Sequence, residues 1–259
     1  MKKYLLCAAL VFFFLVIRDM NQSSAGPADE ITVSAAISLK NTFEEIGKIF
    51  EEKHPGTKIT FNFGASGDLA RQIEGGAPVD VFASAAQKDM DEIDQKGFVT
   101  SGTRINFAGN SIVLVKPSIS RIRIESFENL RKAEVKRIVI GNPKSVPAGR
   151  YAEEVLKYLY LWEGVKEKLV FAEHVRQVLD YVARNEVDAA MVYTTDAMIR
   201  PKEVRIVMKA PDKSHQPIVY PIAIVRESKN KSLAKEFTAL VLSTEGKNLL
   251  SKYGFETVK

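Results

Sequence analysis

The first part of the chain alternates between short apolar runs and stretches in which apolar residues recur with the period of a helix. Residues 31–35 read ITVSA, a run typical of a strand. Leu39, Phe43, Ile46 and Phe50 follow at spacings of four, three and four, which predicts one buried face of a helix. Because strands and helices keep alternating, we expect a parallel sheet with right-handed crossovers. The predicted strands are 31–35, 57–63 and 79–84, and the predicted helices are 39–50, 69–73 and 87–96.

A longer apolar run over 106–115 breaks this rhythm, and a second series of strands and helices follows it. Another long apolar run, 218–225, precedes C-terminal helices that begin near Lys229. The pattern predicts an α/β fold of two lobes joined by these two long strands, each lobe a mostly parallel sheet flanked by helices. We assign 28–109 and 220–259 to the first lobe and 110–219 to the second. The second series consists of strands over 137–141, 169–172 and 188–192 and helices over 147–160 and 174–183.

The first 25 residues have the pattern of a secretory signal. Lys2 and Lys3 precede an apolar run over 4–17, and a polar stretch then ends in Ser-Ser-Ala at 23–25. The run is shorter than the roughly 20 residues that a membrane span needs. We therefore expect 1–25 to be a signal peptide that directs the chain to the periplasm, with an uncleaved anchor as the alternative.

The composition argues against several classes of function. The only cysteine, Cys7, lies inside the predicted leader, so the exported chain has neither disulfides nor thiol chemistry. The net charge is +5, but Lys and Glu alternate along the chain, as on a solvated helix face, so we expect no nucleic-acid partner. The three histidines, His54, His174 and His215, lack metal-ligand spacing, and the chain has no phosphate loop or dinucleotide fingerprint. The sequence thus predicts no enzyme and no cofactor.

Small residues and hydroxyls recur where predicted strands end and helices begin. Taken singly, Ser38 and Ser66 fit helix N-caps, and Pro147 fits a first helical position. Taken together, such turns share one edge of a parallel sheet, where ligands usually bind. Helix N-termini there offer free N–H groups and a partial positive charge, which predicts an anion site without charged side chains. The turns are 35–38, 65–67, 147–149, 173–175 and Tyr193.

Four motifs closely resemble the periplasmic molybdate-binding proteins of molybdate ABC transporters. They are AAISL at 35–39, the run over 63–85, VPAG at 146–149 and VYTTDA at 192–197, and they occur in the family's order between 31 and 255. The resemblance implies a type II periplasmic-binding-protein fold whose lobes close on a tetrahedral oxyanion, molybdate or tungstate, with molybdenum present only as that oxyanion. The contacts it implies are the hydroxyl and N–H of Ser38 and Ser66, the N–H of Ala148 and Val175, and the hydroxyl of Tyr193.

The chain departs from the family pattern at three positions of the cleft. Ile37 stands where a small residue is usual, Ala65 replaces a frequent Ser, and Asp68 stands where Ser or Thr is common. We expect Asp68 to point to solvent, and the alternative is that its carboxylate is a direct ligand of molybdenum.

The sequence therefore predicts a monomeric, non-catalytic receptor that delivers molybdate or tungstate to a membrane permease. Two alternatives stay open. The same fold could bind another oxyanion such as sulfate or phosphate, or a secreted hydrolase could use Ser66 as its nucleophile with a base that the sequence does not supply.

Overall fold

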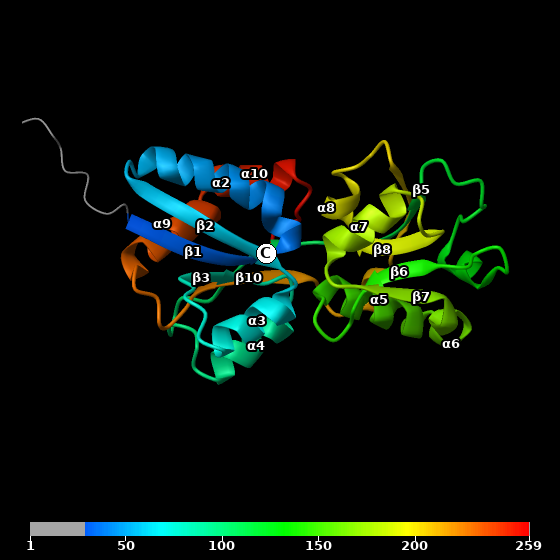
Figure 1. Cartoon of the computed structure of the whole chain (residues 1–259), viewed down its shortest axis with the longest axis horizontal. Coiled ribbons are helices and arrows are strands. Elements are labelled where there is room, and N and C mark those ends of the chain that lie inside the picture. Colours follow the sequence, from blue (N-terminus) through cyan, green and yellow to red (C-terminus); the bar gives the residue numbers. More distant parts are fainter. Residues whose placement is uncertain (1–28, 259) are drawn as a thin grey trace, which may run out of the picture.

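Two five-stranded sheets divide the chain into two lobes that lie side by side along its longest axis (Figure 1). The computed structural model describes residues 29–258, so the predicted signal peptide lies outside the described residues. Sheet 1 has the strand order β2-β1-β3-β10-β4, and sheet 2 has the order β7-β6-β8-β5-β9. The predicted two-lobed fold is therefore confirmed.

In the first lobe, the alternation of strand and helix builds a parallel core. β1 pairs in parallel with β2 and with β3, whereas β10 runs antiparallel to β3 and β4. The strands are β1 (Asp29–Ala36), β2 (Thr57–Gly64), β3 (Val81–Ala83), β4 (Ile105–Gly109) and β10 (Val219–Ile224). The helices are α2 (Lys40–Lys53), α3 (Ser66–Glu74), α4 (Gln87–Gln95), α9 (Lys231–Leu242) and α10 (Thr244–Lys252), with a 3₁₀ turn at Ile37–Leu39.

The second lobe repeats this plan. β6 pairs in parallel with β7 and β8, and β5 runs antiparallel to β8 and β9. The strands are β5 (Ile112–Pro117), β6 (Ile138–Gly141), β7 (Leu169–Ala172), β8 (Ala189–Tyr193) and β9 (Val204–Lys209). The helices are α5 (Pro147–Tyr158), α6 (Trp162–Val165), α7 (Val175–Ala183) and α8 (Thr194–Ala197), with 3₁₀ turns at Phe127–Arg131, Lys166–Lys168 and Asp212–Ser214.

Both sheets are mixed, not mostly parallel, because the chain crosses between the lobes through strands that run against the parallel set. The strand predicted over 106–115 is two strands in different sheets: β4 ends at Gly109 and β5 begins at Ile112. Asn110 and Ser111 therefore form the first crossing. β10 lies entirely in sheet 1, so the chain returns through the segment before it, and β9 is an edge strand that the sequence pattern did not reveal.

The predicted helix periodicity matches the core of the first lobe. Leu39, Phe43, Ile46 and Phe50 are all fully buried. Phe43 meets Phe237 of α9 edge-on at 5.8 Å between ring centroids, in the geometry that aromatic pairs prefer. Helices α2, α9 and α10 lie on one face of sheet 1 and α3 and α4 on the other (Figure 1). The C-terminal helices thus pack on sheet 1 and α2.

The chain after α10 returns to the crossing between the lobes. The backbone N–H of Gly109 donates to the carbonyl of Glu256 at 2.7 Å, and the N–H of Glu256 donates back at 2.9 Å. Phe255 packs edge-on against Tyr220. This short bridge joins the tail to the end of β4.

Candidate functional site

The five residues that the sequence and the resemblance singled out line one cavity between the lobes. The cavity has a volume of about 10 Å³ and lies where the carboxyl ends of the parallel strands of both sheets meet. Pockets for drug-sized ligands usually span roughly 300–1,000 Å³, so this closed cavity is far too small for such a ligand. Its lining is Ala36, Ile37, Ser38, Gly64, Ala65, Ser66, Ala85, Val146, Pro147, Ala148, Val175 and Tyr193.

The first lobe contributes two serines, and neither is a helix N-cap. Ser38 lies in the 3₁₀ turn after β1, and its Oγ is 3.1 Å from the hydroxyl of Tyr220. Ser66 is the first residue of α3, whose N-cap is Ala65. The Oγ of Ser66 accepts a hydrogen bond from the N–H of Ala85 at 2.9 Å. The capping interpretation of these serines is therefore wrong, because the backbone enters each helix one residue earlier or in a tighter turn than the pattern suggested.

The second lobe contributes two helix N-termini and a hydroxyl. Ala148 follows Pro147 in the first turn of α5, where backbone N–H groups have no acceptor within the helix. Val175 begins α7, and its N-cap His174 accepts the N–H of Gln177 on Nδ1 at 3.0 Å. Tyr193 ends β8, is buried, and donates its hydroxyl to the carbonyl of Ala85 at 3.4 Å. Donors from both lobes therefore point to one small space.

The cavity is electrically neutral apart from the ends of its helices. Its lining includes no Lys, Arg, His, Asp or Glu. Tyr193 is its only titratable side chain, and burial raises the pKa of that phenol well above its usual value. The hydroxyl thus stays protonated in the neutral range and can donate. The partial positive charges at the starts of α3, α5 and α7 make the space favourable for an anion.

Two glycines next to the cavity are required by close contacts with backbone atoms. A Cβ on Gly149 would lie 2.0 Å from the carbonyl oxygen of Gly141, so this glycine lets α5 pack against β6. A Cβ on Gly67 would lie 2.8 Å from the carbonyl oxygen of Ser145 in the opposite lobe. Gly67 therefore permits the close approach of the lobes.

Of the three departures from the family pattern, two line the cavity and one does not. Ile37 and Ala65 belong to its wall. The carboxylate of Asp68 is 43% exposed and forms an ion pair with Arg71 one turn along α3. This geometry favours the solvent-facing placement of Asp68 over a ligand role.

Sequence reasoning missed the residues that hold the donors in place. Ala85 orients both Ser66 and Tyr193 through its backbone. It directly follows the predicted strand over 79–84, so the rule that ligands bind at strand ends could have found it.

Arg176 of α7 pairs with the fully buried Asp196 and donates to Asn41 of the first lobe at 2.8 Å. Burial raises the pKa of Asp196, and the charge of Arg176 opposes that shift.

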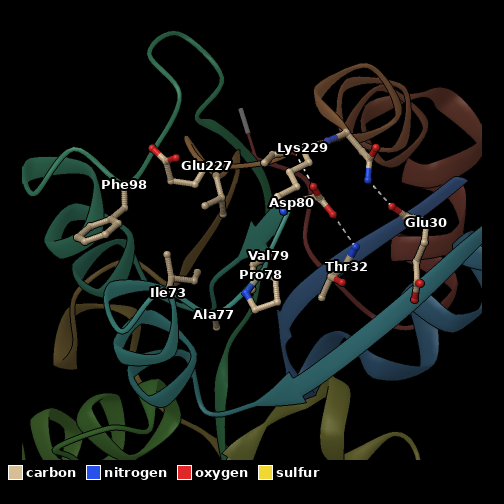
Figure 2. Close-up of a pocket in the computed structure, with 14 residues that line it drawn as sticks. Glu30, Thr32, Ile73, Ala77, Pro78, Val79, Asp80, Phe98, Glu227 and Lys229 are labelled. Carbon is tan, nitrogen blue, oxygen red and sulfur yellow. Dashed lines mark hydrogen bonds between the residues drawn. The ribbon is translucent and has the colours of Figure 1, made fainter.

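A wider groove lies at the opposite edge of sheet 1 (Figure 2), and several of its polar groups bond to one another. Asp80 accepts the N–H of Thr32 at 2.8 Å and the hydroxyl of Ser228 at 2.6 Å. Asn230 donates to the carbonyl of Glu30 at 2.6 Å. These bonds join the segment before α9 to the starts of β1 and β3.

Residues 29–258 contain neither a membrane-spanning helix nor a cluster of metal-ligating side chains. No helix in this range is long and apolar enough to span a bilayer. Within the same range, no group of three or more His, Cys, Asp or Glu side chains is placed to hold a metal ion.

Comparisons with known proteins agree with this architecture. The family model of bacterial extracellular solute-binding proteins matches residues 31–256. A putative ABC transporter substrate-binding lipoprotein of Bacillus subtilis, YvgL, is 43% identical over 258 residues, which cover 98% of each chain. The molybdate-binding protein ModA of Escherichia coli is 40% identical over 238 residues, covering 90% of this chain and 91% of that one.

A solved structure shares both the fold and the sequence. The substrate-binding domain of a putative molybdenum ABC transporter from Clostridium difficile superposes with a TM-score of 0.69 at 37% identity, covering 89% of this chain and 99% of that one. The family resemblance of the sequence motifs is thus confirmed, and this chain belongs to the bacterial extracellular solute-binding proteins.

Proposed function

We propose that the protein is a receptor that captures molybdate or tungstate between its lobes and delivers it to the membrane permease of an ABC transporter. The observation that carries this proposal is the convergence of Ser38, Ser66, Ala148, Val175 and Tyr193 on one small cavity without charged side chains. The names of the relatives from Escherichia coli and Clostridium difficile support molybdenum as the element of the ligand.

Neutral donors suffice to bind a dianion at this site. Each charge-assisted hydrogen bond contributes about 1.5–3 kcal/mol. About five to seven such bonds, less the cost of ordering and closing the lobes, correspond to a Kd between roughly micromolar and nanomolar. Because sulfate carries the same charge as molybdate, discrimination between them must come from the size of the cavity.

We further propose that the protein acts as a monomer in the periplasm, after removal of residues 1–25. Membership in an extracellular family supports a location outside the cytoplasm. In this role the protein has neither a catalytic group nor a cofactor, and the ligand is its cargo.

The hydrolase alternative has no support in the geometry. A serine nucleophile needs a base within hydrogen-bond reach. The Oγ of Ser66 instead accepts the N–H of Ala85, and the cavity lining contributes no histidine, carboxylate or lysine. Sulfate and phosphate remain alternatives within the binding class.

Calorimetric titration of the exported chain with molybdate, tungstate, sulfate and phosphate tests the proposal. We expect tight binding of molybdate and tungstate and much weaker binding of the other two. A preference for sulfate or phosphate would assign the site to that oxyanion, and binding of none of the four would reject an oxyanion receptor.

A further inference from the structure

Contacts between the lobes occur within two residues of the expected ligand donors. The N–H of Gly67, next to Ser66, donates across the cleft to the carbonyl of Ser145 at 3.0 Å. Arg150, two residues after Ala148 in α5, forms an ion pair with Asp89 of α4 in the first lobe. Closure therefore brings together the N-terminal turns of α3, α4 and α5.

The Arg150–Asp89 pair is buried at the junction between the lobes. Its side chains are only 14% and 3% exposed. Burial raises the pKa of Asp89, and the positive charge of Arg150 opposes this shift. A charge left buried without its partner is costly. Closing the lobes is therefore unfavourable when only one member of the pair is present.

The Gly67–Ser145 contact has the opposite effect, because it limits closure. It joins backbone to backbone, and a Cβ on Gly67 would lie 2.8 Å from the Ser145 oxygen and 3.0 Å from its Cα. The lobes thus cannot approach further at this point without a steric clash. Gly67 lies in α3 without a positive φ, so its backbone does not itself require glycine.

We infer that the Arg150–Asp89 pair and the Gly67–Ser145 contact together set the distance between Ser66 and Ala148, and thereby the size of the oxyanion that the cleft accepts. The pair pulls the lobes together, and the glycine contact stops them at a fixed separation. A smaller tetrahedral dianion such as sulfate then cannot touch donors on both sides at once. This inference rests on the proposed molybdate function.

The first test makes the steric stop larger. Gly67→Ala should hold the lobes slightly apart, and we expect the affinity for molybdate to fall about 10-fold or more, with a lower molybdate-to-sulfate ratio. The melting temperature of the unliganded variant should not fall, because alanine favours a helix over glycine.

The second test removes the pair. Asp89→Asn and Arg150→Met should each weaken molybdate binding by roughly 10- to 100-fold. The double variant Asp89→Leu with Arg150→Met should regain most of the affinity, since it leaves no buried charge. The control is Arg200→Met, which breaks an ion pair with Asp180 inside the second lobe and should leave affinity unchanged.

Titrations of the wild type and these variants with molybdate and sulfate separate the two claims. If the wild type binds molybdate and all variants keep its affinity and selectivity, the inference is wrong and the proposed function stands. If the single and double variants of the pair lose equal affinity, the pair is not a clamp between the lobes. A wild type that binds no molybdate would overturn both claims.

Discussion

Ser66→Ala removes one hydroxyl that we expect to bond both to the ligand and to the protein backbone. The effects of this substitution on binding and on stability can be measured separately. In the structure this Oγ accepts the N–H of Ala85. Loss of the acceptor leaves a buried N–H unpaired, which costs about 1–3 kcal/mol of folding stability. A chain of this size loses about 2–4 °C of Tm per kcal/mol, so we expect the unliganded variant to melt roughly 2–12 °C lower.

The effect on binding has a different origin. The unpaired N–H of Ala85 is present with and without ligand, so its cost largely cancels from the affinity. The variant should instead lose one charge-assisted bond to the anion, about 1.5–3 kcal/mol, or roughly 10- to 150-fold in Kd. Calorimetric titration with molybdate measures this change, and thermal unfolding of the unliganded protein measures the change in stability.

Ser84 and Ser38 provide matched comparisons. Ser84 is a buried serine directly before Ala85. Its Oγ donates to the carbonyl of Ala86 at 2.7 Å, and it does not line the cavity. Ser84→Ala should lower stability and leave affinity unchanged. Ser38→Ala should lower affinity as Ser66→Ala does. It should destabilise the protein less, because the Tyr220 hydroxyl still accepts a hydrogen bond from the side-chain amide of Asn110 at 3.2 Å. If Ser66→Ala behaves like Ser84→Ala, the Ser66 hydroxyl is structural and our assignment of it to the ligand is wrong.

Three further predictions concern the ligand, the surface charge and pH. Molybdate should raise Tm more than sulfate does at equal concentration, because a ligand that binds only the folded state stabilises it; equal shifts would contradict the proposed selectivity. Asp68→Thr should bind molybdate equally or slightly more tightly at low salt, and the difference should shrink as salt screens the repulsion between the Asp68 carboxylate and the anion. Titrations at two ionic strengths measure this, and a large loss of affinity would make Asp68 a ligand. Because burial raises the pKa of the Tyr193 phenol, this group stays protonated at every pH below the ordinary tyrosine pKa. Molybdate affinity should therefore stay constant between about pH 7.5 and 9. A decline in affinity over that window would mean that a titrating group contacts the ligand.

The parts of the fold that the sequence predicted well depend on local patterns. The buried face from Leu39 to Phe50 follows from helix periodicity, and the convergence of Ser38 and Ser66 follows from the rule that parallel strands end at one edge of a sheet. The break at Asn110 and Ser111 was missed, because the apolar run continues across a point where the chain changes sheets. Such a change is decided by strand pairing over long distances and leaves no periodic signal.

The site was predicted less completely than the fold, for a similar reason. The sequence pattern placed the turn over 173–175 at the ligand edge, but Val175 as a contact came only from the family resemblance, because the start of α7 has no small residue or hydroxyl to mark it. Arg150 and Asp89 are far apart in the sequence and belong to different lobes. Their pairing depends on closure, and each resembles an ordinary surface charge when read alone.

The bridge between the tail and the end of β4 affects how this protein can be labelled. Glu256 bonds to Gly109 through its backbone and to the hydroxyl of Ser111 through its carboxylate, so the tail touches both sides of the first crossing between the lobes. A bulky tag placed directly after this residue would restrict movement between the lobes at this crossing, and a fluorophore there would report on that movement. A tag intended to be silent in binding assays therefore belongs before Asp29, where β1 begins at the end opposite the cavity.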